Sequence, residues 1–136
     1  ISLINKPKIL RLGGLEISKI NKCLNKRLNL QLNFSKNLSP GQMKLHYSPG
    51  IPIKLNIRNP KKNEAYLFLK KNKTYKKNFF FLSKSGSLKE AAKNLYSTLR
   101  KIKKKKFQSI SVEKIDNKGL GKVINDRLLR ASKFNG

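Results

Sequence analysis

Few side chains in this sequence have the types and the spacing that catalysis requires. His46 is the only histidine, and a single histidine is more often a hydrogen-bonded structural residue than a general base. Cys23, the only cysteine, has no histidine or second cysteine at zinc-ligand spacing. The carboxylates show no pairing typical of acid–base catalysis or metal binding; they belong to Glu16, Glu64, Glu90, Glu113, Asp116 and Asp126. Taken alone, these residues predict no metal site and no catalytic residue within the chain.

The short motif Gly119-Leu120-Gly121 has the glycines of a phosphate-binding turn, because a helix N-terminus presents free N–H groups to anions. The dinucleotide fingerprint G-x-G-x-x-G is incomplete, however, since Ile124 stands in place of the third glycine. A tight turn from a strand into a helix is the favoured interpretation. On that helix, Asp126 lies beside Arg127 and Arg130, and we interpret them as surface ion pairing.

The elements that must position these residues differ along the chain. Residues 8–12 are predicted to end a short strand, and a helix with Ile17, Ile20 and Leu24 on one face follows. Such a helix needs a body to pack against, and the sequence supplies none before residue 50. This pattern indicates a domain that is cut in the middle.

Residues 35–60 form an irregular connection, because their four prolines remove backbone donors and fix φ. A passive linker would be rich in Ser, Gly and Lys. This one contains Met43, Leu45, His46 and Tyr47 between its prolines, and such side chains require a surface to lie on. Long loops of this kind are usually functional or interdomain segments.

The sequence after residue 50 is typical of an α/β unit. Ser87-Leu88-Lys89-Glu90 is a capping box, in which Ser87 binds the N–H of Glu90 and Glu90 reaches back. A final helix begins near Gly119. The capping box opens an amphipathic helix whose apolar stripe consists of Leu88, Ala91, Ala92, Leu95, Leu99 and Ile102. Strands are predicted at 51–57, 65–69, 79–82 and 107–112. Strands separated by helices favour a mainly parallel sheet, so we predict a small Rossmann-like α/β domain over residues 51–136.

The net charge of +27, from 33 basic and 6 acidic residues, favours a nucleic-acid partner because neutralised phosphates release counterions. Most of the basic residues are lysines, however, and they are spread along the whole chain. We therefore weigh a compositional background at roughly two to one over a specific binding face. A basic RNA-binding or ribosome-associated module is the alternative function, and a structural interaction domain is the third. No apolar run approaches the ~20 residues of a membrane span, and one cysteine fits a reducing cytoplasm.

Four motifs, in order, resemble the long, two-domain YrdC/TsaC-type threonylcarbamoyl-AMP synthases. The segment Ser39-Pro40-Gly41-Gln42-Met43-Lys44-Leu45-His46-Tyr47-Ser48-Pro49 resembles their interdomain linker, which ends in H-Y-[AS]-P. Residues 9–13 resemble the I-L-R-P-G that closes the catalytic domain, with Leu12 in place of proline. Residues 91–100 resemble A-A-x-N-L-[FY]-x-x-L-R, and residues 119–128 resemble G-L-G-x-A-I-x-D-R-L, with Val123 in place of alanine.

The resemblance implies three parts. Residues 1–34 would be the C-terminal tail of a truncated YrdC-like catalytic domain, residues 35–50 the linker and active-site lid, and residues 51–136 the Rossmann-like accessory domain. The family forms threonylcarbamoyl-AMP from L-threonine, bicarbonate and ATP, releasing pyrophosphate, for the threonylcarbamoyladenosine modification of tRNA. ATP would be a substrate, used with Mg²⁺, and no tightly bound cofactor is expected. The expected partners are the missing catalytic domain and other enzymes of the pathway; direct tRNA binding is left open.

Three residues carry the implied site. Arg11 would be the family's L-R-P-G arginine near the ATP phosphates and threonine, since a guanidinium meets phosphate or carboxylate oxygens bidentately. His46 and Tyr47 would lie on the lid that shuts water out from a reactive mixed anhydride. The remaining catalytic positions would lie upstream, so we expect the chain alone to be inactive.

Overall fold

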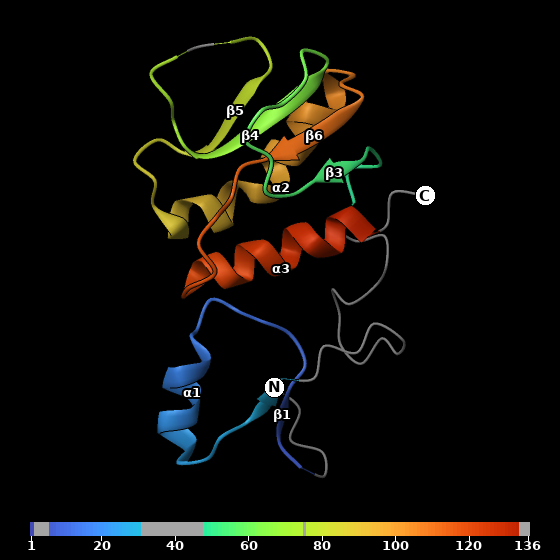
Figure 1. Cartoon of the computed structure of the whole chain (residues 1–136). Helices are drawn as coiled ribbons and strands as arrows, with labels where there is room; N and C mark the ends of the chain where they lie inside the picture. Colours follow the sequence, from blue (N-terminus) through green and yellow to red (C-terminus); the bar gives the residue numbers. More distant parts are fainter. Residues whose placement is uncertain (2–5, 31–47, 75, 134–136) are drawn as a thin grey trace. The chain divides into compact units, whose positions relative to one another are not determined.

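The computed structural model describes residues 1, 6–30, 48–74 and 76–133. The chain divides into two compact units, Ile1–His46 and Tyr47–Gly136, and each is described by itself. Figure 1 shows the elements of both. Most of the segment assigned to the linker, residues 35–47, lies outside the described residues.

The first unit is a small β-α-β arrangement. β1 (Lys8–Ile9) pairs in parallel with β2 (Asn29–Leu30), and α1 (Ile17–Leu24) connects them. α1 ends at Asn25, which is left-handed with φ 46° and donates its N–H to carbonyls of the last turn. The predicted helix is therefore present, whereas the strand predicted at residues 8–12 is shorter than predicted, because only Lys8–Ile9 pairs. No residue of α1 is buried within the described structure, as the sequence pattern led us to expect.

The second unit contains a parallel sheet in the order β3-β6-β4-β5. Its strands are β3 (Ile53–Lys54), β4 (Glu64–Lys70), β5 (Phe79–Ser83) and β6 (Ser109–Val112). All the pairings are parallel, with Ala65 of β4 opposite Ile110 of β6 and Leu67 of β4 opposite Phe80 of β5. The mixed α/β fold with a parallel sheet is thus confirmed.

The predicted strand at 51–57 is wrong in its length, because only Ile53–Lys54 pairs as β3. Pro52 precedes the strand and has no N–H to donate to a ladder. Asn56 adopts a left-handed conformation, with φ 59°, which ends the extended run. Among the described residues of this second unit, only the β5–β6 connection contains a helix. Irregular segments join β3 to β4 and β4 to β5.

One face of the sheet packs against α2 (Leu88–Lys104) and α3 (Leu120–Lys133) in a single hydrophobic core. Side chains alternate along a strand, so Ala65 and Leu67 of β4 face this core while Glu64 and Tyr66 point to the opposite face. The buried members of the core are Ile53, Ala65, Leu67, Leu82, Ala91, Leu95, Leu99, Ile102, Ile110, Val112, Ile115, Ile124, Leu128 and Ala131. The amphipathic stripe predicted for residues 88–102 supplies four of them: Ala91, Leu95, Leu99 and Ile102.

Candidate functional site

Arg11 follows β1 in a segment whose apolar residues hold it in place. Leu10 and Leu12, on either side of it, are buried, whereas Arg11 itself is exposed. The buried neighbours anchor the backbone on both sides of this exposed residue. An arginine presented in this way can form two parallel hydrogen bonds to a phosphate or a carboxylate.

His46 and Tyr47, the two predicted lid residues, lie outside the described residues. Only the end of their motif is visible. There Pro49 is buried, and the Ser48 hydroxyl accepts a hydrogen bond from the Gly50 N–H at 3.1 Å. The structure therefore tests neither the lid nor its relation to Arg11.

The glycine motif forms a turn at the start of α3, where the Gly121 N–H donates to the Lys118 carbonyl at 2.9 Å; residues 113–119 separate α3 from β6, so the predicted tight turn directly from a strand into the helix is wrong. A Cβ on Gly121 would lie 2.1 Å from the carbonyl oxygen of Asp116, so no other residue fits without a backbone shift. Asn125 then donates from Nδ2 to the Ile115 carbonyl at 3.0 Å, which fixes the helix to the preceding loop. These contacts explain the motif through packing alone, without a phosphate.

Two further interpretations need correction. The Asp126–Arg130 pair, at 3.0 Å, is not on the surface, because its side chains are only 10% and 8% exposed.

In the capping box, Ser87 does accept from the Glu90 N–H at 3.3 Å. The carboxylate of Glu90 accepts instead from Ser83 Oγ, because that hydroxyl already takes the Ser87 N–H at 2.9 Å.

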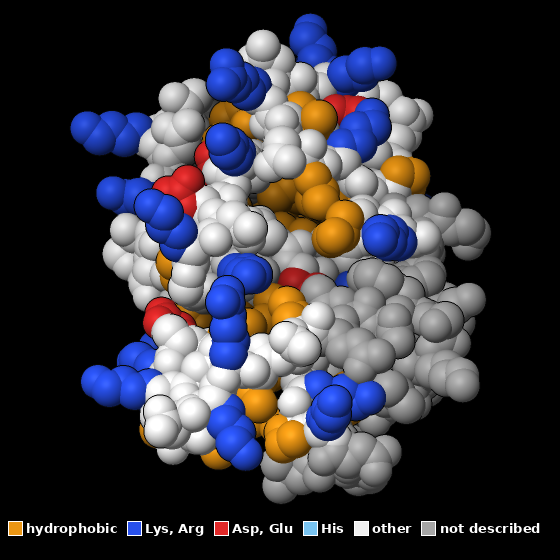
Figure 2. Space-filling model, turned by 60° about the horizontal axis from the view of Figure 1, so that its bottom comes forward, with side chains coloured by type: hydrophobic (Ala, Val, Ile, Leu, Met, Phe, Trp, Pro, Cys, Tyr) orange, Lys and Arg blue, Asp and Glu red, His pale blue; other side chains and the backbone are white. Residues whose placement is uncertain are grey.

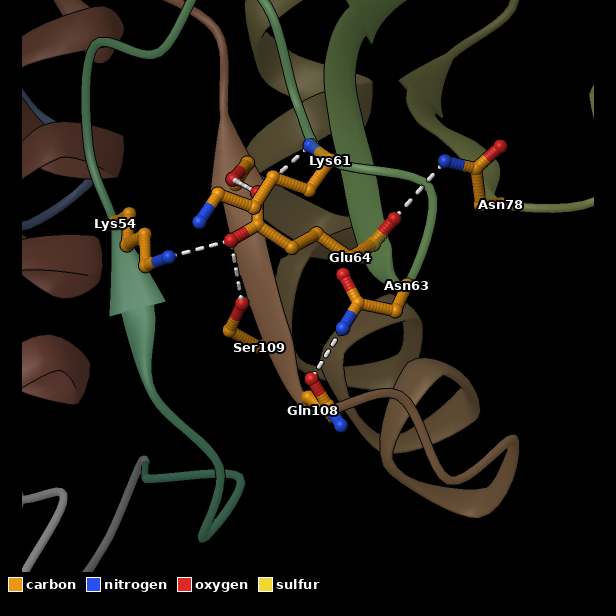
Figure 3. A network of polar contacts seen from close by, with 8 residues as sticks. Lys54, Lys61, Asn63, Glu64, Asn78, Gln108 and Ser109 are labelled. Atoms are coloured by element: carbon orange, nitrogen blue, oxygen red, sulfur yellow. Dashed lines mark hydrogen bonds and ion pairs between the residues drawn. The ribbon is translucent and has the colours of Figure 1, made fainter.

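Figure 3 shows a polar network around Glu64 that the sequence did not reveal. Glu64 begins β4 on the face opposite the helices and is 4% exposed. Its carboxylate accepts from the Lys54 ammonium and from the Lys61 N–H at 3.1 Å. It also accepts from two hydroxyls of β6, those of Ser109 at 3.1 Å and Ser111 at 2.8 Å. The one available signal was the alternation of serine with apolar residues along residues 109–112.

These contacts lower the pKa of Glu64 from 4.5 to about 2. The main cause is the hydrogen bond from Lys54, followed by that from the Lys61 backbone; burial acts in the opposite direction, and the two serines add to the lowering. A carboxylate with four donors and so low a pKa is a poor proton acceptor near neutral pH. Glu64 is therefore a structural anchor that joins β3, β4 and β6.

The described residues contain no metal centre, because no group of three His, Cys, Asp or Glu side chains lies close enough to hold an ion. Cys23 is a free, exposed thiol. None of the helices in the described part is long and apolar enough to cross a membrane. Figure 2 shows Lys and Arg side chains scattered over the visible described surface rather than gathered in one patch.

The comparisons with known proteins agree with the motifs. The family model for the threonylcarbamoyl-AMP synthase C-terminal domain matches residues 15–133. The crystal structure of P. abyssi Sua5 complexed with L-threonine matches with a TM-score of 0.70 and 22% identity. That match covers 93% of this chain and 42% of the Sua5 chain, and at this identity it shows the fold alone. No curated protein matches the chain. From the family match, the chain belongs to the threonylcarbamoyl-AMP synthase C-terminal domain family.

Proposed function

We propose that this chain is the C-terminal part of an L-threonylcarbamoyladenylate synthase. The observation that carries the proposal is the family match over residues 15–133. The chain corresponds to only 42% of the length of the Sua5 structure, which leaves room for a catalytic domain upstream. That Sua5 structure is described as complexed with L-threonine, which agrees with threonine as a substrate of the whole enzyme.

The complete enzyme would form threonylcarbamoyl-AMP from L-threonine, bicarbonate and ATP, and release pyrophosphate. The product would supply the threonylcarbamoyl group for tRNA modification, together with other enzymes of that pathway in the cytoplasm. ATP would enter as a substrate with Mg²⁺. In this chain, Arg11 would contact the ATP phosphates or threonine, and His46 and Tyr47 would belong to a lid that excludes water from the mixed anhydride.

The position of Arg11, an exposed residue between two buried leucines, supports its part of the proposal. A side chain that served packing alone would be turned inward with them. In the complete enzyme, Arg11→Ala should raise the KM for ATP or threonine about tenfold or more, as expected for the loss of a charge-assisted bidentate contact. Arg11→Lys should restore little of it, because an ammonium lacks the two-pronged geometry. Arg27→Ala, an exposed arginine of the same unit, is the matched control.

The function is tested by assaying pyrophosphate release that depends on both threonine and bicarbonate. The chain alone should release none, whereas the chain extended upstream through its own coding sequence should be active. We expect that upstream sequence to encode a YrdC-like domain with K-x-R and S-A-N motifs. Activity of the isolated chain would refute its being an inactive part, and an inactive extended protein would refute the synthase function.

A further inference from the structure

A groove of about 320 Å³ runs between β5 and α2 in the second unit. One wall is the strand, with Phe79, Phe80 and Phe81, and the other is a stripe of α2 that includes Asn94 and Lys101. β5 is the last strand in the sheet order, and among the described residues it pairs only with β4. The groove therefore has the form of a sheet edge that a helix flanks.

The backbone of β5 offers hydrogen-bonding groups to this groove. The N–H of Tyr66 on β4 donates to the carbonyl of Asn78 at 2.7 Å, which directs the backbone of Phe80 toward β4 as well. Successive residues of a strand face opposite neighbours, so the N–H and C=O of Phe81 point outward. Farther along, Asn94 of α2 donates to the Leu82 carbonyl at 3.0 Å and holds the helix beside the strand. An outward-facing edge of this kind is a template for an extended chain.

The charged side chains around the groove indicate the sign of the charge that its ligand carries. Lys84 and Lys101 line it, and Lys76 and Lys77 precede β5 in the sequence. Glu90 is the one carboxylate in the lining, and its Oε2 already accepts from the Ser83 hydroxyl. A second copy of this chain, with a net charge of +27, would bring the same lysines against these and be repelled. A negatively charged peptide would complement the lysines of the groove.

We propose that the groove between β5 and α2 binds an extended acidic peptide of a partner protein, which pairs with β5 as an added strand. Main-chain hydrogen bonds to Phe81 give the peptide its place at the edge. The ring of Phe81, 38% exposed, offers apolar surface to one side chain of the peptide. Carboxylates of the peptide lie near Lys84 and Lys101, which distinguishes it from a neutral strand.

The probe is a fluorescein-labelled peptide of alternating glutamate and valine, titrated with the full chain and followed by anisotropy. The same peptide with methyl groups on alternate backbone nitrogens keeps the charge and the side chains but loses donors at the edge. It should bind several-fold more weakly, because the peptide N–H that donates to the Phe81 carbonyl is lost, together with about 1 kcal/mol. Amide chemical shifts in the labelled chain should move at β5 and along the facing side of α2.

Paired variants locate the binding on the chain. Phe81→Pro removes the outward N–H without removing a bond to β4, and it should weaken binding about tenfold. Phe81→Val keeps that N–H and should weaken it less. Lys101→Glu should weaken binding several-fold, whereas Lys93→Glu, an exposed change of equal charge on the same helix, should have little effect. If Phe81→Pro does not fold, the lysine pair and the methylated peptide decide the question.

Three results would overturn the proposal. Binding of the methylated peptide as tight as that of the unmodified one would exclude strand pairing. A single-stranded RNA oligonucleotide of equal charge that binds more tightly and moves the same amides would identify a nucleic-acid site instead. Concentration-dependent dimers in sedimentation that Phe81→Pro abolishes would identify a second copy as the occupant.

Discussion

The two units differ in how far each of them buries an amphipathic helix. α1 and α2 both carry apolar side chains on one face, yet α1 has no buried residue whereas α2 has five. α2 packs on a four-stranded sheet, while the sheet of the first unit has two strands of two residues each. An amphipathic pattern therefore predicts that a helix forms and which face is apolar, but the stability of that helix depends on what covers the face.

The largest contrast should come from removing one leucine from each helix. Leu95 of α2 is fully buried, so Leu95→Ala should lower the free energy of unfolding by about 2–5 kcal/mol through lost burial and a cavity. Leu24 of α1 is 44% exposed, and Leu24→Ala should cost only about 0.5 kcal/mol. Urea unfolding followed by circular dichroism measures both. Equal losses would show that α1 has an apolar partner equivalent to that of α2.

A pair of glycines extends the comparison to the backbone. Gly121→Ala should destabilise the second unit by about 1–3 kcal/mol, because the new methyl group meets the Asp116 carbonyl. Gly13 of the first unit has no atom within 4 Å of such a methyl group, so Gly13→Ala should change stability little. Thermal unfolding of the two variants provides the test. If Gly121→Ala leaves the stability unchanged, the loop that contains Asp116 shifts at little cost in free energy.

Two glutamates compare a buried carboxylate with an exposed one. Glu64→Gln should cost about 1–3 kcal/mol, because the amide cannot accept from all four donors. Its folded pKa lies below its unfolded value, so the stabilisation is present above pH 4.5 and is lost as the pH falls toward about 2. Stability measured from neutral pH to about pH 2 should therefore converge for wild type and Glu64→Gln. Glu16→Gln, which changes an exposed carboxylate in the first unit, should track the wild type throughout.

The smallest contrast is between the two helix N-caps. Ser87 accepts from the Glu90 N–H, so Ser87→Ala should cost about 1 kcal/mol. Glu16 precedes α1 without a capping hydrogen bond from its side chain, and Glu16→Ala should cost little. Amide hydrogen exchange in the first turn of each helix distinguishes the two. Faster exchange at α1 alone would reverse the expected order.

The sequence predicted those parts of the fold that local pattern determines. The apolar spacing of Leu95, Leu99 and Ile102 placed α2 and its buried face correctly. The sequence did not predict the order of the strands. β6 lies between β3 and β4, and these pairings join residues that are far apart in the chain. It also missed the Glu64 network, whose serine donors lie 45 and 47 residues away.

For the site, the sequence contributed motifs rather than geometry. Arg11 was found only through the resemblance of residues 9–13 to a family motif, and its exposure between buried leucines is the structural addition. The lid residues His46 and Tyr47 stay a prediction. The groove beside β5 could not be foreseen, because it depends on which strand ends at the sheet edge and on where α2 crosses it.

The position of β6 has a consequence for the order of events at the ribosome. β6 is the last of these four strands to be synthesised, yet among the strands that the structure describes it is the one partner of β3 and one of the two partners of β4. β4 and β5 can pair as soon as residue 83 has emerged. β3 must wait until residue 112 follows, and until then Glu64 lacks both of its serine donors. The pairing of β4 with β5 is therefore possible before β6 is available, whereas β3 joins the sheet only when β6 enters between β3 and β4.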